Sequence, residues 1–579
     1  MTTEPAPKKM RTKLILKIIL WFIAVIFVFS AAAFTYGYFY YGEIVREFVI
    51  KTIERDSKGI YRADIGSISL NILAGNLTIK KFELIPDTAL FRKKAVTDTL
   101  SPILIRLRIA EFRIRGFGIM ELIRNKQIDL RRIRFMEPDI SVYRMRATVK
   151  PTEDKPKNKL ISIPLPEGLS AVNIKEILFE KGKLAYFDLS GDSLVSYSIP
   201  SCDIVIKNIM IDSVHRGQDR LFNADDINIM LGGIVLTTKN GMNRISLGEI
   251  GLSTGDQSVY VKNFQLEPLF NNHDYTRKLG FQTDRMDIAV TMLQIKRLNF
   301  RDLILTGKFK AGLLEIDSLV LDDYRDKRVP PRPGFKPPMP QDGLRNLKTY
   351  LKIDTVLLKG GKATYSEQVG AEPGTIFFDK MSATFTGLTN DSMLLAGGLV
   401  SELRGTAYLM GKGKLDATVR FKFGDPKNSF TFSGRVGEID LREINPMLSK
   451  LLPAEVTSGQ INKLEILQVT ANDDVATGKL LFYYKNLSIS MIDKKKTTWG
   501  KIKKGVINFV ANDLVVNNDN PTASGKMHTG TVYFKRDKYK GIINFLWKST
   551  LSGLKSTMGF NSKAQKEIIK HEKEQQKKK

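Results

Sequence analysis

The chain has 579 residues, of which 90 are Lys or Arg and 61 are Asp or Glu, giving a formal net charge of +29. An apolar content of 42% excludes wholesale disorder, and the single cysteine, Cys202, excludes an internal disulfide framework. The length exceeds that of one compact domain unless the chain forms an elongated repeat structure. The positive charge fits nucleic acid, anionic lipid headgroups or an acidic protein, or simply Lys and Arg that solvate the outer faces of strands.

Residues 18–41 are 24 consecutive uncharged residues, enough for one helix to cross a bilayer. Five basic residues precede them, so the positive-inside rule keeps residues 1–17 in the cytoplasm and exports the body of the chain. The run Ser30 to Ala33 resembles a signal-peptide cleavage site, which is the competing interpretation. The apolar stretch continues eight residues past Ala33, and this length favours an uncleaved anchor.

Helical spacing of apolar residues predicts a helix from Glu43 to Ser57, after which the period changes to two. Ile68, Leu70 and Ile72 alternate with polar residues, and a Gly75-Asn76 turn leads into a return strand. This stretch therefore predicts a β-hairpin.

The next alternating stretch carries Ile105, Leu107 and Ile109 on one face. Its phase slips at Ala110, as a bulge or a strand end would produce, and resumes at Phe112.

Two stretches resemble each other closely enough to predict an internal duplication. Residues 174–186 (IKEILFEKGKLAY) align without a gap on residues 353–365 (IDTVLLKGGKATY). Alternating strands precede each stretch, at 109–143 and 293–324, followed by charged, proline-bearing linkers at 144–166 and 325–340. Shared order, content and spacing make two unrelated β-meanders the weaker interpretation.

The pattern predicts a mainly β fold with few helices. Strands with one apolar side must bury that side by closing a barrel, by stacking on a second sheet, or by curling into a trough filled by an apolar ligand. Alternation alone does not choose among these arrangements.

No residue constellation indicates an enzyme, so we expect no catalytic residues, no metal and no cofactor. The blocks Gly191-Asp192-Ser193-Leu194 and Asp212-Ser213-Val214-His215 spell esterase motifs, but they lie too close together and among strands. The histidines have no Cys or acidic partner at metal-ligand spacing.

Three parts of the chain carry a family resemblance. They are the hairpin ISLNILAGNLTIKKFEL (68–84), the segment ending EPDISVYR (108–144), and residues 439–492 with IDLREINPML, SGQINKLEI and GKLLFYYKNLSISMI. In these parts the chain resembles the AsmA-like superfamily, which includes AsmA and TamB. Residues 521–559 are similar to a bacteroidete-type branch. The resemblance covers most of residues 12–559 and is more specific for the family than for a substrate.

The resemblance implies a protein of the inner membrane of a Gram-negative bacterium, with a single-pass anchor and its body in the periplasm, that serves outer-membrane biogenesis. It implies an elongated, curved β-sheet, open like a groove, whose apolar concave face carries phospholipids without catalysis. The candidate groove residues are then Ile68, Leu70, Ile72, Ile105, Leu107 and Ile109. Implied partners are phospholipids, the inner membrane, and outer-membrane or periplasmic assembly proteins, and not nucleic acid. The alternative is a scaffold that regulates targeting and assembly of outer-membrane proteins, with a groove filled by side chains.

The predicted organisation has seven parts. They are a basic cytoplasmic N-terminus (1–17), the transmembrane anchor (18–41), a first β-repeat with linker (42–166), a second β-repeat with Pro-rich linker (167–340), a C-terminal β-region (341–540), an amphipathic helix (541–560) and a basic disordered tail (561–579). In the amphipathic helix, Ile542, Phe545, Leu546, Leu551 and Leu554 recur at helical spacing. These residues would lie in a membrane interface, plug one end of the groove, or pack on the protein's own sheet.

Overall fold

The computed structural model describes residues 41–71, 74–94, 102–146, 168–191, 195–212, 223–452, 454–491 and 517–577. Strand accounts for 56% and helix for 20%, and 22 strands form one large mixed sheet. The predicted mainly β fold with few helices is thereby confirmed. By its contacts the chain divides into unit 1 (residues 1–236 and 247–259) and unit 2 (237–246 and 260–579).

Among the described residues, no helix is both long enough and apolar enough to cross a bilayer. The predicted anchor lies outside these residues except for Tyr41, where helix α2 begins. Ile72 and most of the linker 144–166 also lie outside them.

The described elements of unit 1 are α2 (Tyr41–Asp56), β1 (Tyr61–Asn71), β2 (Asn76–Pro86), α3 (Thr88–Lys94), β3 (Ile103–Arg115), α4 (Ile119–Asn125), β4 (Gln127–Leu130), β5 (Arg132–Met136), β6 (Asp139–Met145), β7 (Ala171–Leu189), β8 (Val195–Asp212) and β9 (Asp226–Thr237). Strands β10 (Asn243–Ser253) and β11 (Ser258–Pro268) contribute residues to both units.

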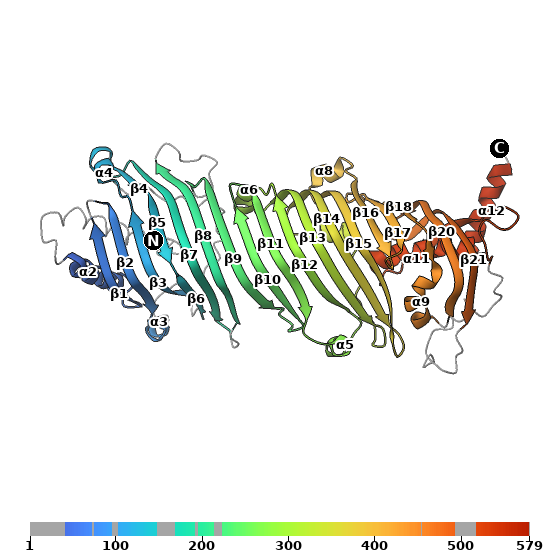
Figure 1. Cartoon of the computed structure of the whole chain (residues 1–579), viewed down its shortest axis with the longest axis horizontal. Helices are drawn as coiled ribbons and strands as arrows, with labels where there is room; N and C mark the ends of the chain where they lie inside the picture. Colours follow the sequence, from blue (N-terminus) through green and yellow to red (C-terminus); the bar gives the residue numbers. More distant parts are fainter. Residues whose placement is uncertain are drawn as a thin grey trace, which may run out of the picture. The chain divides into compact units, whose positions relative to one another are not determined.

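The described elements of unit 2 that follow are α5 (Asn272–Leu279), β12 (Asp284–Lys296), α6 (Phe300–Thr306), β13 (Phe309–Asp326), α7 (Pro340–Arg345), β14 (Leu351–Gln368), β15 (Pro373–Thr389), α8 (Ser392–Ala396), β16 (Ser401–Leu409), β17 (Gly413–Phe421), β18 (Phe430–Val436), β19 (Ile439–Asp440), η3 (Leu441–Ile444), α9 (Asn445–Leu451), β20 (Ala454–Ala471), β21 (Val475–Met491), β22 (Thr529–Lys535), α11 (Ile542–Thr557) and α12 (Lys563–Lys577). From β12 onward these strands follow one another across the sheet largely in chain order (Figure 1).

The predicted N-terminal helix and hairpin are both present in unit 1. Helix α2 covers the predicted residues to within two positions at its start and one at its end. Strands β1 and β2 pair antiparallel from Tyr61 opposite Pro86 to Asn71 opposite Asn76. Gly75 lies in the connecting turn at φ 61°, a left-handed conformation that glycine adopts without steric cost.

The predicted phase slip at Ala110 occurs within one unbroken strand, β3. The register with β2 does not change across it, since Lys80 lies opposite Glu111 and Phe82 opposite Ile109. The side-chain alternation of β2 also changes phase here, at Lys81, which takes φ 56°. Because both strands shift phase together, the apolar side chains before and after the slip stay on one face of the sheet.

The two similar stretches found in the sequence occupy equivalent places in the structure. Strand β7 pairs in parallel with β4, β5 and β6, and β14 pairs in parallel with β13. Positive φ values recur at matching positions, at Glu137 (51°) and Lys181 (56°) in one copy and at Ser318 (56°) and Gly360 (72°) in the other. The parallel pairing was not part of the sequence-based prediction.

The largest buried cluster lies in unit 2, where aromatic side chains of β17 to β21 meet helix α11. Phe430 contacts Phe545 edge-on, with ring centroids 6.0 Å apart, and both side chains are almost fully buried. The segment predicted as a disordered tail contains α12 instead. Gln565 of α12 is buried and donates to the Thr531 carbonyl (2.7 Å) and the Ser552 carbonyl (3.1 Å), which fixes the helix to β22 and α11.

Candidate functional site

Apolar side chains of unit 1 lie opposite one another in continuous rows across seven strands. One row consists of Leu70, Leu77, Ile114, Ile133, Ile177, Ile206 and Ile227. The next consists of Ile68, Ile79, Phe112, Phe135, Phe179, Ile204 and Ile229. Neighbouring strands lie about 4.8 Å apart, so directly opposed side chains touch and the rows form one apolar surface. We call this surface the apolar face of unit 1.

The candidate groove residues that are described all belong to this face. Ile109 is buried, and Ile68, Leu70 and Leu107 pack against the same buried cluster, which includes Val45 and Val49 of α2. Ile105 is half-buried, and its backbone N–H donates to the Tyr61 hydroxyl at 3.1 Å. Helix α2 packs on β1 and contributes Val45 and Val49 to this cluster, so it covers the β1 side of the face.

Farther along the second row, the face of unit 1 has less cover, whereas the first row ends in a further buried cluster at Ile227. Phe179 stacks on Phe135 with ring centroids 4.4 Å apart, yet both side chains are only half-buried. Ile204, the neighbour of Phe179 on β8, is also half-buried. These side chains retain apolar surface that a ligand would remove from water.

A second apolar surface lies in unit 2, on β12, β13 and β14. Two paired rows make it up, namely Leu293, Ile316 and Leu358, and Ile295, Leu314 and Val356. All six side chains are half-buried, and among the residues that the structure describes none of the six belongs to a buried apolar cluster or packs against one. We call these six residues the open aliphatic patch.

The opposite side of the same strands is charged. Glu315 lies between Lys296 and Lys359 and pairs with both, and these two lysines hold the pKa of its carboxyl group below its ordinary value. One side of β13 therefore faces water, while the other presents hydrocarbon. The two-residue period of the sequence therefore separates a charged side of the strand from an apolar side.

One row of the open aliphatic patch continues into a closed core. It runs from Val356 through Phe385 and Leu403 to Val419. Val419 is buried in the cluster that contains Phe545 of α11. The same row is thus open at β14 and covered at β17.

Helix α11 buries most of the residues predicted to lie at a membrane interface. Phe545 is part of the core, and Ile542, Leu546 and Leu554 pack against it, while Leu551 is half-buried. This is the own-sheet arrangement that the sequence analysis kept as an alternative. The helix leaves Ile543 and Trp547 exposed instead.

Ionisable side chains border the open aliphatic patch beyond the phase shift at Ser318 and Gly360. Arg325 forms two hydrogen bonds with Asp284, at 2.5 and 2.6 Å. Burial, reinforced by the nearby Asp284 carboxylate, raises the pKa of Asp323 to about 7 even though Arg325 opposes the shift. Lys327 pairs with Glu367 at 2.6 Å. This border holds cations and anions directly beside hydrocarbon.

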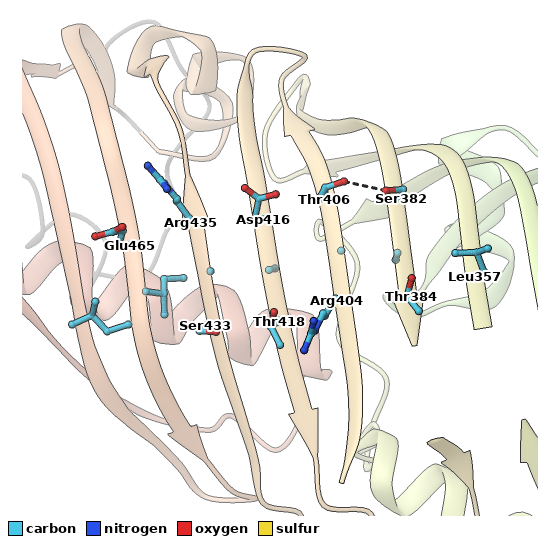
Figure 2. A pocket seen from close by; sticks show the side chains of 16 residues that line it. Leu357, Ser382, Thr384, Arg404, Thr406, Asp416, Thr418, Ser433, Arg435 and Glu465 are labelled. Atoms are coloured by element: carbon cyan, nitrogen blue, oxygen red, sulfur yellow. Dashed lines mark hydrogen bonds between the residues drawn. The ribbon is translucent and has the colours of Figure 1, made fainter. Parts of the chain in front are cut away.

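A separate hollow of about 630 Å³ lies on the other side of β15 to β20 (Figure 2). Its floor is a row of small residues, Ala383, Gly405, Ala417 and Gly434, paired in succession. Hydroxyl and charged side chains rise on both sides of that row, among them Ser382, which bonds Thr406 at 3.1 Å, and the ion-paired Arg404. An acyl chain would meet mixed surroundings there, because Leu357, Ile466 and Leu467 line the hollow together with the polar side chains.

The sequence analysis did not select the open aliphatic patch as a site. Its signal was present, since residues 293–324 were recognised as alternating strands, but alternation does not say which strands remain uncovered. Searches of protein-family models and of curated proteins found no match to this chain.

Proposed function

We propose that this protein binds phospholipids by their acyl chains along the apolar faces of its sheet and conducts them between membranes. In this proposal the predicted N-terminal helix anchors it in the inner membrane of a Gram-negative bacterium, and the body serves outer-membrane biogenesis from the periplasm. The resemblance to the AsmA-like superfamily supports this setting.

The observation that carries the proposal is the open aliphatic patch. Six half-buried aliphatic side chains lie together without a buried cluster to cover them, and their rows continue into neighbouring strands. Each methylene group that an acyl chain buries there stabilises the complex by about 0.8 kcal/mol. Along a row of similar side chains a lipid can move without losing this energy at any single step.

Photocrosslinking in cells tests the proposal with an internal control. Leu357 and Leu358 are adjacent leucines of β14 whose side chains point to opposite faces. Benzoylphenylalanine at position 358 of the full chain should crosslink to radiolabelled phospholipid, and the same group at position 357 should not. Equal labelling at both positions, or none at 358, would refute binding on this face.

A scaffold that acts through protein contacts is the second candidate, and one observation favours it. The N-terminal part of the apolar face is filled by α2, with Val45 and Val49 in the buried cluster. In a scaffold the remaining face would be filled in the same way by protein. Crosslinking of position 358 to protein alone would support this function over lipid carriage.

A further inference from the structure

Helix α11 carries a second apolar side that faces away from the sheet. Ile543 is 75% exposed and Trp547 is 52% exposed, although both lie two residues from the buried Phe545. At 100° per residue, a separation of two positions puts them about 160° around the helix from Phe545. Tyr539, one turn before Ile543 along the chain, is 58% exposed.

The proline-bearing segment before α7 extends this surface. Phe335 is 46% exposed, and the Arg332 guanidinium lies 4.8 Å from its ring centroid. Lys336 lies 5.7 Å from the centroid of the Tyr539 ring. Arg536 donates to the Pro337 carbonyl at 3.2 Å, so the two segments are held side by side. We call Phe335, Tyr539, Ile543 and Trp547 the aromatic patch.

Basic side chains outnumber acidic ones in the two segments that form the aromatic patch. Five of the basic side chains are already paired with carboxylates, namely Arg325, Lys327, Arg328, Arg536 and Lys538. Residues 325–340 contain five basic side chains and one acid, and residues 536–548 contain four basic side chains and one acid. The acid of the first segment, Asp326, is buried and paired with Arg328 at 2.6 Å. The acid of the second, Asp537, accepts a hydrogen bond from the Tyr539 N–H at 2.9 Å. Arg332, Lys336 and Lys548 are exposed.

We propose that the aromatic patch docks on the surface of a bilayer that contains anionic lipid. Tyr and Trp favour the headgroup region because their rings are apolar and their N–H or O–H groups remain hydrated there. Ile543 and Phe335 add apolar area to bury, and each basic side chain close to the surface contributes about 1 kcal/mol. This contact is distinct from the predicted N-terminal anchor and does not depend on lipid carriage along the sheet.

A vesicle-capture experiment tests the proposal with the full chain. The protein is reconstituted into dense, sucrose-loaded vesicles of phosphatidylcholine, which accommodate the predicted anchor. Fluorescent acceptor vesicles rich in phosphatidylglycerol are added, and the acceptors that sediment with the dense vesicles are measured. Capture of the phosphatidylglycerol-rich vesicles should exceed capture of phosphatidylcholine vesicles. It should fall at high salt, because screening weakens the contribution of the basic residues.

Two variants and a matched control make the result specific. Ile543→Ser combined with Trp547→Ser should lower capture by about fivefold or more, since both side chains supply buried apolar area. Arg332→Glu combined with Lys336→Glu changes only exposed side chains and should lower capture without affecting folding. Met393→Ser on α8 removes another exposed apolar residue, 81% exposed, and should leave capture unchanged.

Three results would overturn the proposal. The first is that the unchanged protein captures no acceptor vesicles. The second is that both double variants capture as many vesicles as the unchanged protein. The third is that neutral and anionic acceptor vesicles are captured equally. If a photocrosslinker at position 547 labels a protein while no vesicles are captured, the aromatic patch binds an acidic protein instead.

Discussion

Strands β14 and β17 of unit 2 belong to the same cross-strand row and yet have different surroundings. Val356 on β14 is half-buried and lies in the open aliphatic patch, whereas Val419 on β17 is buried in the cluster that α11 covers. The residue type is the same at both positions, and each strand is paired on both of its sides. The difference shows that alternation creates an apolar face and that only a covering element turns part of it into core.

The largest expected effect comes from introducing the same charged residue at Val419 and, in a separate variant, at Val356. Val419→Glu buries an unpaired carboxylate and should lower the free energy of unfolding by about 4 kcal/mol or more. Val356→Glu should cost about 1 kcal/mol, because its carboxylate remains in contact with water. The denaturant midpoint for loss of protease resistance in the full chain measures both effects. Equal losses would mean that the patch at β14 is packed as tightly as the core.

A smaller effect should follow from loosening the cover itself. A Cβ added at Gly553 of α11 would lie 2.5 Å from Leu480 Cδ2 and 2.7 Å from Val532 Cγ2. Gly553→Ala should therefore push the helix from β21 and β22 and lower the free energy of unfolding by about 2 kcal/mol. Hydrogen exchange of β21 and β22 should rise in this variant while that of β13 stays unchanged. Gly541→Ala, where a Cβ meets no atom within 4 Å, is the control.

The smallest effect concerns the charged border of the open aliphatic patch. Asp323 has a folded pKa of about 7 against an ordinary value of 3.8, so the fold favours its protonated form. Its stabilising contribution is then complete below about pH 4 and is lost as the pH rises through 7. Asp323→Asn should remove this fall, making the variant more stable than the unchanged protein at pH 8 by about 1 kcal/mol.

Thermal unfolding at a series of pH values measures this difference. Asp322→Asn changes the exposed neighbour on the other face, whose carboxylate adds least to the raised pKa of Asp323, and should preserve most of the pH dependence. The same pH dependence in the Asp323→Asn variant would show that another group causes it.

Local patterns predicted the local structure well. The helix after residue 42 and the hairpin at 68–84 follow from periodicity and one glycine turn, because both elements form between residues that are close in the chain. The phase slip at Ala110 was also predicted, but the sequence did not show that it occurs within one continuous strand. The slip stays within one strand because Lys81 on the neighbouring strand shifts at the same level, a coordination between residues far apart in sequence.

The sequence predicted an apolar surface as the candidate site, but it selected residues other than those that the structure leaves least covered. Ile68, Leu70, Leu107 and Ile109 do lie on the apolar face, but they belong to or pack against the buried cluster to which α2 contributes. The uncovered residues, such as Leu314 and Val356, carry the same alternating pattern. In α11 the helical spacing selected Phe545, which is buried, and passed over Trp547, which is exposed. Amphipathic spacing identifies an apolar side of a helix without saying whether sheet or solvent meets it.

The sequence by itself determined that the chain is mainly β, that its strands have one apolar side, and that two stretches share a pattern. These properties depend on neighbouring residues and on the two-residue period of a strand. Tertiary structure alone decided the parallel pairing of β13 with β14, the burial of Val419 under α11, the incomplete burial of the open aliphatic patch, and the exposure of the aromatic patch. The physical reason is that burial depends on which distant element packs against a surface. The residue type at a position does not indicate whether such an element will cover it.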